Sequence, residues 1–328
     1  IKKFRDHLFF KIYKNIKIKK SKFFYIDKNN ETILISPIHN FHYSIKEKSK
    51  HKNLTIKGNI FDVDYESIWK RYYDSPKITH HEIAFKNPNL FIKNLFLFEG
   101  KSNYSGKSAI SFLKKKINIE YNVNKDKIFI KSSDEIKNQE IKILSNIELN
   151  PFYFDSVIEL SNKDSKFLID NFLNYLMNVN EDIFGNINGK IVVKLKNLNN
   201  EIIDSGIINL IINEKSLKIE NTKLEIKKIG FIKSIFSFYE KQGELIFKSK
   251  NVLEITNKKE FGKKFQLNLK KAEKVNKIYF DLEKNIEKDK FSIFNIYVNK
   301  IDAEQQYKEP TYLKNMQLLK SFLNNILN

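Results

Sequence analysis

The stretch "EGKSNYSGKSAISFL" at Glu99–Leu113 is the part of the chain that comes closest to a phosphate-binding loop. Such a loop places four residues between two glycines, so that successive backbone amides converge on phosphate oxygens. Here five residues separate Gly100 from Gly106, and no strand–helix–strand unit surrounds them. We therefore reject nucleotide binding and expect a loop between two strands.

Histidine is the next residue type that could form a metal site or a catalytic site, because imidazole binds metals and transfers protons. His39 and His42 are three positions apart in a predicted strand, which puts them on opposite faces, and the neighbours His80 and His81 diverge in the same way. A zinc site needs three or four converging ligands, and the chain has no cysteine. The sequence predicts no metal site, no disulfide and no cofactor.

No catalytic constellation emerges from the remaining polar residues. Asp62, Asp64 and Glu66 alternate at the start of a predicted helix, where carboxylates cap the helix as readily as they form an acid pair. No serine lies in a Gly-x-Ser-x-Gly elbow. Trp69 and its neighbouring tyrosines form either an interfacial aromatic patch or, as we favour, a packing surface. We expect a protein that is not an enzyme.

The charge of the chain is large but diffuse. Its 328 residues include 59 Lys and Arg against 39 Asp and Glu, a formal net charge of +20. The two signs alternate along the chain and form no basic stripe, so we expect no nucleic-acid partner. No apolar run reaches the 18–20 residues that a membrane span needs, and the first residue is Ile1, which is what a fragment of a longer product would show.

The elements that would have to position any site are mostly short strands separated by polar turns. Alternation is clearest in "GKIVVKLKNL" and "SGIINLIINEKSLKIENTKLEI", and "KFQLNLK" near residue 267 is also expected to be a strand. Helices are predicted at Tyr65–Tyr73, Ser165–Val179, Ile229–Gly243 and Thr311–Leu327, the last amphipathic.

This pattern predicts a mainly β fold, a long antiparallel meander curled into an open groove, with a few short helices and a C-terminal amphipathic helix. Residues 1–150 would form the N-terminal β-rich part of the groove, and residues 151–328 its C-terminal region with the terminal helix. The two parts are expected to share one continuous, elongated sheet.

The order of segments in the second half resembles the C-terminal region of the AsmA-like family, bacterial relatives of the bridge-like lipid transfer proteins. The segments are "IELNPFYFDSVIEL", "FGNINGKIVVKLKNL", "SGIINLIINEKSLKIENTKLEI", "IGFIKSIFSFYEKQGELIFKSKNVLEITNKKEFGKKFQL" and "KIYFDLEKN"; "KFFYIDKNNETILISPI" and "LTIKGNIFDVDYESIWKRYYDSP" resemble the upstream part. The resemblance implies a periplasmic groove at the inner membrane that handles phospholipid between the two bacterial membranes. It also implies a membrane partner, reached through the family's N-terminal anchor, which we expect to be missing from these residues.

The residue pattern supports the same function independently, because burying each CH₂ group of a lipid is worth roughly 0.8 kcal/mol and only a continuous apolar lining supplies that. The alternative is an assembly factor for outer-membrane proteins that binds envelope proteins through strand edges. The positions expected to line the groove and bind phospholipid are Ile191, Val193, Leu195, Ile208, Leu210, Ile212, Leu217, Ile219, Phe247, Phe265, Leu267, Leu269, Ile278, Phe280 and Leu282.

Overall fold

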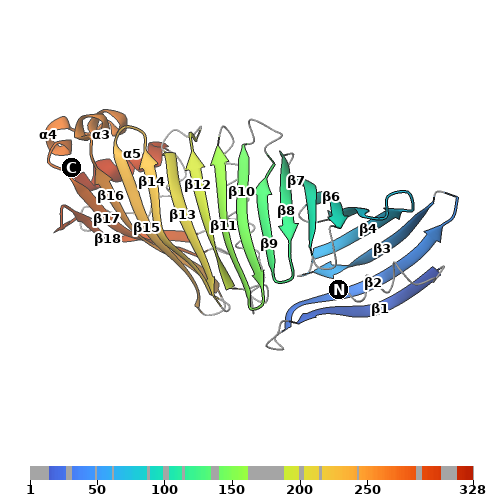
Figure 1. Ribbon diagram of the computed structural model, residues 1–328. Coiled ribbons are helices and arrows are strands. Elements are labelled where there is room, and N and C mark those ends of the chain that lie inside the picture. Colours follow the sequence, from blue (N-terminus) through green and yellow to red (C-terminus); the bar gives the residue numbers. More distant parts are fainter. Residues whose placement is uncertain are drawn as a thin grey trace. The chain divides into compact units, whose positions relative to one another are not determined.

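The chain is built almost entirely of strands that follow one another in sequence order (Figure 1). The computed structural model describes residues 15–26, 32–48, 50–60, 63–86, 89–98, 103–112, 115–133, 140–161, 188–198, 203–213, 216–241, 244–285, 290–303 and 316–327. These residues form 19 strands of one open antiparallel sheet and three short helices. The expected mainly β, open meander is confirmed.

The strands and helices have the following bounds. The strands are β1 (Asn15–Ile26), β2 (Thr32–Lys46), β3 (His51–Ile60), β4 (Val63–Tyr72), β5 (Ile78–Phe85), β6 (Leu90–Phe98), β7 (Tyr104–Phe112), β8 (Lys115–Val123), β9 (Lys127–Ser132), β10 (Ile141–Leu149), β11 (Phe152–Ser161), β12 (Asn188–Lys196), β13 (Ile203–Asn213), β14 (Ser216–Ile226), β15 (Gly230–Lys241), β16 (Glu244–Ile255), β17 (Lys277–Asn285), β18 (Lys290–Val298) and β19 (Ile301–Asp302). The helices are α3 (Lys258–Phe265), α4 (Leu269–Ala272) and α5 (Met316–Leu327).

Alternation of side chains explains why these segments are strands. In β8, Ile117, Ile119, Tyr121 and Val123 are all buried, while the residues between them are more exposed. A period of two puts alternate residues on one face, so a sheet that is apolar on one side can bury that side only. Direct cross-strand partners share a face, and the registers therefore define which residues meet.

The chain divides into two compact units, each described here by itself. Unit 1 comprises residues 1–156 and 180–189, and contains β1–β10 and the first half of β11. Unit 2 comprises residues 157–179 and 190–328, and contains nearly all of β12, then β13–β19 and the helices α3, α4 and α5. Within each unit, the strands with a defined register pair antiparallel to the next strand in the chain.

Two predicted helices are strands instead. Residues 65–73 fall mostly in β4, which pairs with β3 and β5, and residues 229–243 fall mostly in β15, which pairs with β14 and β16. Apolar residues in both segments happen to fit a helical spacing, but hydrogen bonds from a strand on each side outweigh that local preference. Glu66 accordingly caps no helix; its carboxylate lies 3.1 Å from the ammonium group of Lys57 on the neighbouring strand.

The expected loop around Gly106 is also wrong, because Gly106 lies inside β7. Its register partner in β8 is Tyr121, and the tyrosine ring occupies the space that a Cβ atom at Gly106 would need. A glycine in a strand often marks such a close approach. The motif is therefore part of the sheet, which agrees with the rejection of a phosphate-binding loop.

One predicted strand is helical. Phe265, Leu267 and Leu269 alternate as in a strand, yet Phe265 ends α3 and Leu269 begins α4. The side chain of Asn257 accepts a hydrogen bond from the backbone N–H of Glu260, which caps α3, and Asn268 caps α4 in the same way. These caps are the sequence signals for the two helices.

The C-terminal helix is confirmed as α5, over Met316–Leu327. Its buried side chains Phe322, Leu323 and Ile326 join Phe261 and Phe265 of α3 in the main hydrophobic cluster of unit 2. The helix predicted at Ser165–Val179 lies outside the described residues.

Candidate functional site: an aliphatic sheet face

Most of the predicted lining residues of β12–β14 lie together on one side of unit 2, which we call the aliphatic face. Leu210 is in register with Ile219, and Ile212 with Leu217, so these four share that face. The cluster on this face consists of the buried residues Val193, Leu195, Leu198, Leu210 and Ile219 and the half-buried residues Leu160, Ile191, Ile203, Ile208, Leu217, Leu224 and Phe236. Of the eight lining residues predicted in β12–β14, seven belong to this cluster. The eighth, Ile212, is also buried.

The aliphatic face continues across β15–β17 through cross-strand neighbours. Phe236 of β15 stacks on Phe247 of β16 with 5.4 Å between ring centroids. Ser249 lies two residues after Phe247 and so on the same face, and its register partner in β17 is Leu282. Ile278 and Phe280 are on this side too, but they belong to the cluster under the helices. The ring of Phe280 meets that of α5 Phe322 edge-on at 5.9 Å.

Three predicted lining residues do not line a sheet face at all. Phe265 and Leu267 are buried among α3, α5 and the strand ends, and Leu269 is 49% exposed. Helices therefore cover one end of the aliphatic face, where the sequence predicted further strand. The lining prediction is wrong for these three residues because helix caps interrupt the alternation.

A row of polar side chains crosses the aliphatic face. Thr222, Ser234 and Asn251 lie on adjacent strands in register. Ser234 Oγ donates to Asn251 Oδ1 at 2.7 Å, and Asn251 Nδ2 donates to Ser249 Oγ at 2.9 Å. Thr222 is 1% exposed, and its hydroxyl has no hydrogen-bond partner among the residues that the structure describes. Sequence reasoning missed this row, although small polar residues at core-facing positions of an alternating pattern were a visible signal.

Unit 1 carries a different side, which we call the aromatic face. Trp69 stacks on His81 with 3.9 Å between centroids and on Phe96 at 5.3 Å, and Phe96 meets Tyr121 edge-on at 5.7 Å. These residues come from β4, β5, β6 and β8. Sequence analysis assigned no site here.

His81 is the centre of a hydrogen-bonded row on the aromatic face. Trp69 Nε1 donates to Ser67 Oγ at 2.8 Å, and that hydroxyl lies 2.9 Å from His81 Nε2. On the other side of the ring, Asn94 Nδ2 donates to His81 Nδ1 at 2.8 Å, while Ser108 Oγ donates to Asn94 Oδ1. Burial lowers the pKa of His81 from 6.5 to about 4, so the ring is neutral near pH 7. Every partner is uncharged, and the row has the form of a structural network.

A second polar feature of the aromatic face is the buried guanidinium of Arg71. Its Nε donates to Thr79 Oγ1 at 2.9 Å, and its Cζ lies 4.6 Å from the ring centre of Phe98. Lys52 is in register with Arg71. Burial and the neighbouring guanidinium lower the pKa of Lys52.

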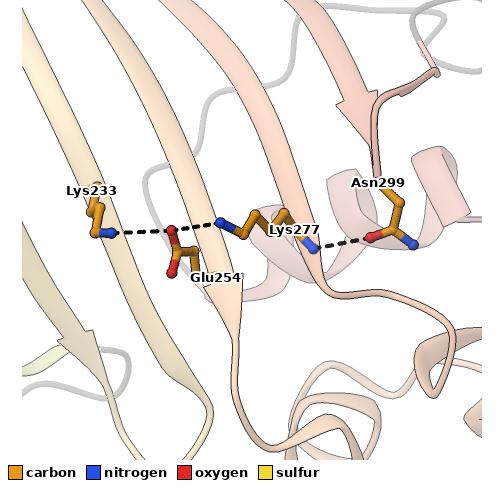
Figure 2. Close-up of polar contacts among 4 residues, drawn as sticks. All are labelled: Lys233, Glu254, Lys277 and Asn299. Atoms are coloured by element: carbon orange, nitrogen blue, oxygen red, sulfur yellow. Dashed lines mark hydrogen bonds and ion pairs between the residues drawn. The ribbon is translucent and has the colours of Figure 1, made fainter.

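The opposite side of unit 2 carries charged ladders, shown in Figure 2. The Glu254 carboxylate lies 3.2 Å from Lys233 Nζ and 3.1 Å from Lys277 Nζ. The pKa of Glu254 is lowered, mainly by the hydrogen bond from Lys277, and burial partly offsets this decrease. Asn299 Oδ1 accepts from the backbone N–H of Lys277 at 3.1 Å. These contacts join neighbouring strands on the charged side of the sheet.

Other kinds of site are not found in the part of the chain that the structure describes. No group of three or more His, Asp or Glu there converges as metal ligands. None of the described helices is long and apolar enough to cross a membrane. A depression of about 700 Å³ lies at the ends of β7–β11 in unit 1, with a mixed lining that includes Tyr104, Phe129 and Tyr153, and it contains none of the predicted lining residues.

Comparison of the chain with protein-family models, with curated proteins and with solved structures gives no significant match. The functional argument therefore rests on the residues and geometry above.

Proposed function

We propose that the chain is a non-enzymatic lipid-binding protein of the bacterial envelope that handles phospholipid between the inner and outer membranes. The observation that carries the proposal is the aliphatic face, on which seven predicted lining residues form one cluster. Its location would be the periplasmic face of the inner membrane, as in the AsmA-like proteins that the sequence resembles.

The half-buried members of the cluster are the part of the face that an acyl chain would contact. Ile208, Leu217 and Phe236 keep part of their surface accessible, whereas Leu210 is only 1% exposed. Each methylene that moves from water onto such a surface gains roughly 0.8 kcal/mol, so a run of side chains is needed to hold one acyl chain. The polar row of Thr222, Ser234 and Asn251 divides this surface, and the buried Thr222 hydroxyl has no partner among the described residues.

Native mass spectrometry with lipid extraction tests the proposal. We expect phospholipid to co-purify with the chain at a defined stoichiometry and to be lost in Leu217→Glu, because a carboxylate repels acyl chains. Leu217 is half-buried, which leaves the variant a better chance of folding than a change at Leu210. The matched control is Ile235→Glu on the opposite side of the sheet, where the native side chain is exposed.

The outcomes separate the candidate functions. Lipid retained by a folded Leu217→Glu variant would remove the aliphatic face as the binding surface. A clean mass without lipid for the native chain would favour the assembly-factor function, which predicts co-purifying protein instead.

A further inference from the structure

One end of unit 2 gathers an unusual number of lysines. Hydrogen bonds join two turns to the segments that flank α3 and α4. The backbone N–H groups of Thr256 and Asn257, before α3, donate to Ile229 O at 2.8 and 2.9 Å. Asn299 Nδ2 donates to Lys274 O, after α4, at 2.6 Å. We define the lysine-rich end as residues 227–229, 257–277 and 299–302. In Figure 1 the helices α3 and α4 of this end lie together beyond the ends of the strands.

The charge of the lysine-rich end is strongly one-sided. It contains eleven lysines against the three carboxylates of Glu260, Glu273 and Asp302, and it contains no arginine or histidine. One of the lysines, Lys277, is paired with Glu254 just outside these residues. The lysines are Lys227, Lys228, Lys258, Lys259, Lys263, Lys264, Lys270, Lys271, Lys274, Lys277 and Lys300. These 28 residues carry a net charge of +8, out of the formal +20 of the whole chain.

Two aliphatic side chains project from the same end. Ile301 is 73% exposed, the highest value among the large hydrophobic side chains that the structure describes, and Leu269 of α4 is exposed as well. Beneath them, Phe261 and Phe265 of α3 are fully buried and fix the helix to the sheet. The end therefore presents aliphatic tips among lysines on a firmly packed base.

We propose that the lysine-rich end docks on an anionic lipid bilayer. Lysines within reach of anionic headgroups attract the surface, and exposed aliphatic side chains enter the boundary between headgroups and acyl chains. A nucleic-acid surface would call for arginine forks or aromatic platforms, and this end exposes neither. The docking uses no residue of the aliphatic face, so it does not depend on acyl-chain binding there.

Vesicle co-sedimentation tests the docking. We expect the chain to bind vesicles in which about a third of the lipid is phosphatidylglycerol, and to leave phosphatidylcholine vesicles unbound. Added salt should weaken binding because it screens the lysines. The variant Lys259→Gln/Lys270→Gln/Lys274→Gln should bind about 100-fold more weakly, since each lysine near the surface contributes roughly a factor of five.

The control variant is Lys194→Gln/Lys218→Gln/Lys250→Gln, which removes the same charge from exposed positions of β12, β14 and β16. It should keep most of the affinity. Equal losses in the two triple variants, or equal binding to both kinds of vesicle, would overturn the proposal. Loss of affinity for a duplex oligonucleotide in the first variant, with vesicle binding unchanged, would overturn it in favour of a nucleic-acid surface.

A further variant tests the aliphatic contribution. Ile301→Ser should lower the affinity that remains in high salt, where electrostatic attraction is screened. Unchanged residual affinity would contradict insertion of this side chain. The vesicle assay and the lipid-extraction assay report on different surfaces, so one can fail while the other succeeds.

Discussion

His81 holds two neighbouring strands of unit 1 through neutral partners on both ring nitrogens. Ser67 and Asn94 contact Nε2 and Nδ1, and the Trp69 ring covers one face of the imidazole. A second proton on the imidazole would place a positive charge in a buried position, and none of these three partners carries a negative charge to stabilise it. The folded state therefore favours the neutral ring.

The stability of unit 1 should consequently fall in acid. The pKa of His81 is about 4 when folded and about 6.5 when unfolded, so the contribution of the neutral ring is fully present above pH 6.5. This contribution is lost as the pH falls from about 6.5 towards 4, and the free energy of unfolding then decreases by about 3 kcal/mol at most. Urea unfolding between pH 4 and 7.5 measures this loss, and His81→Gln should flatten the dependence.

The neighbour His80 provides the control. It is exposed on the other side of β5, so His80→Gln should leave the pH dependence of unfolding as it is in the native chain. A dependence that is the same in the native chain and in His81→Gln would contradict the role of His81.

Gly106 gives a second prediction at the scale of one residue. A Cβ atom there would collide with the ring and hydroxyl of Tyr121 and with Leu95 O across the strand pair. Gly106→Ala should therefore destabilise unit 1 by about 1–3 kcal/mol, the usual cost of overpacking. Urea unfolding measures the loss of stability. The control is Asn122→Ala at an exposed position of β8, which should change the free energy of unfolding by no more than about 0.5 kcal/mol. An unchanged free energy of unfolding in Gly106→Ala would contradict the close packing of Gly106 against Tyr121.

At the scale of elements, the sequence predicted strands well where alternation is uninterrupted. The segments β12, β13 and β14 were all expected, because a strand buried on one side needs only a period of two. The face shared by Leu210 and Ile219 followed from the same reasoning. That these residues meet depends on register, which alternation alone does not specify.

The failures occurred where local spacing was compatible with two structures. Trp69 and Tyr72 fit a helix by spacing, but β3 and β5 pair with that segment and make it a strand. Leu267 and Leu269 fit a strand, but the caps Asn257 and Asn268 begin helices. The hydrogen-bonded row around His81 was beyond prediction, since its members come from four different strands.

The helix α5 contacts the sheet through an aromatic side chain, Phe322. Phe322 is almost fully buried, meets Phe280 edge-on, and lies in the cluster that contains Phe261 and Phe265. Phe322→Ala should lower the stability of unit 2 by about 3–5 kcal/mol through lost burial and a cavity. Thermal and urea unfolding measure it, with Ser321→Ala on the exposed side of α5 as the control. Equal effects of the two changes would show that α5 is not packed as described.

At the scale of the whole molecule, the defined strand pairings join each strand to the next strand in the chain. Stability in such an arrangement is close to a sum of local terms and contacts between neighbours, as in repeat proteins. The hydrophobic clusters are also local: the cluster around Phe322 and the cluster of Phe41, Tyr43 and Leu54 share no residue. A change in one cluster should act mainly on the strands around it.

We therefore expect the two units to open separately. In hydrogen exchange followed by mass spectrometry, Phe322→Ala should speed exchange in α3, α5 and β16–β18 and leave β3–β8 at the native rate. Gly106→Ala should give the reverse pattern, because its collision is with β6 and β8 of unit 1. Each variant serves as the control for the other. Acceleration spread evenly over all the strands in either variant would show instead that the chain unfolds as one cooperative body, and that the sheet transmits stability beyond neighbouring strands.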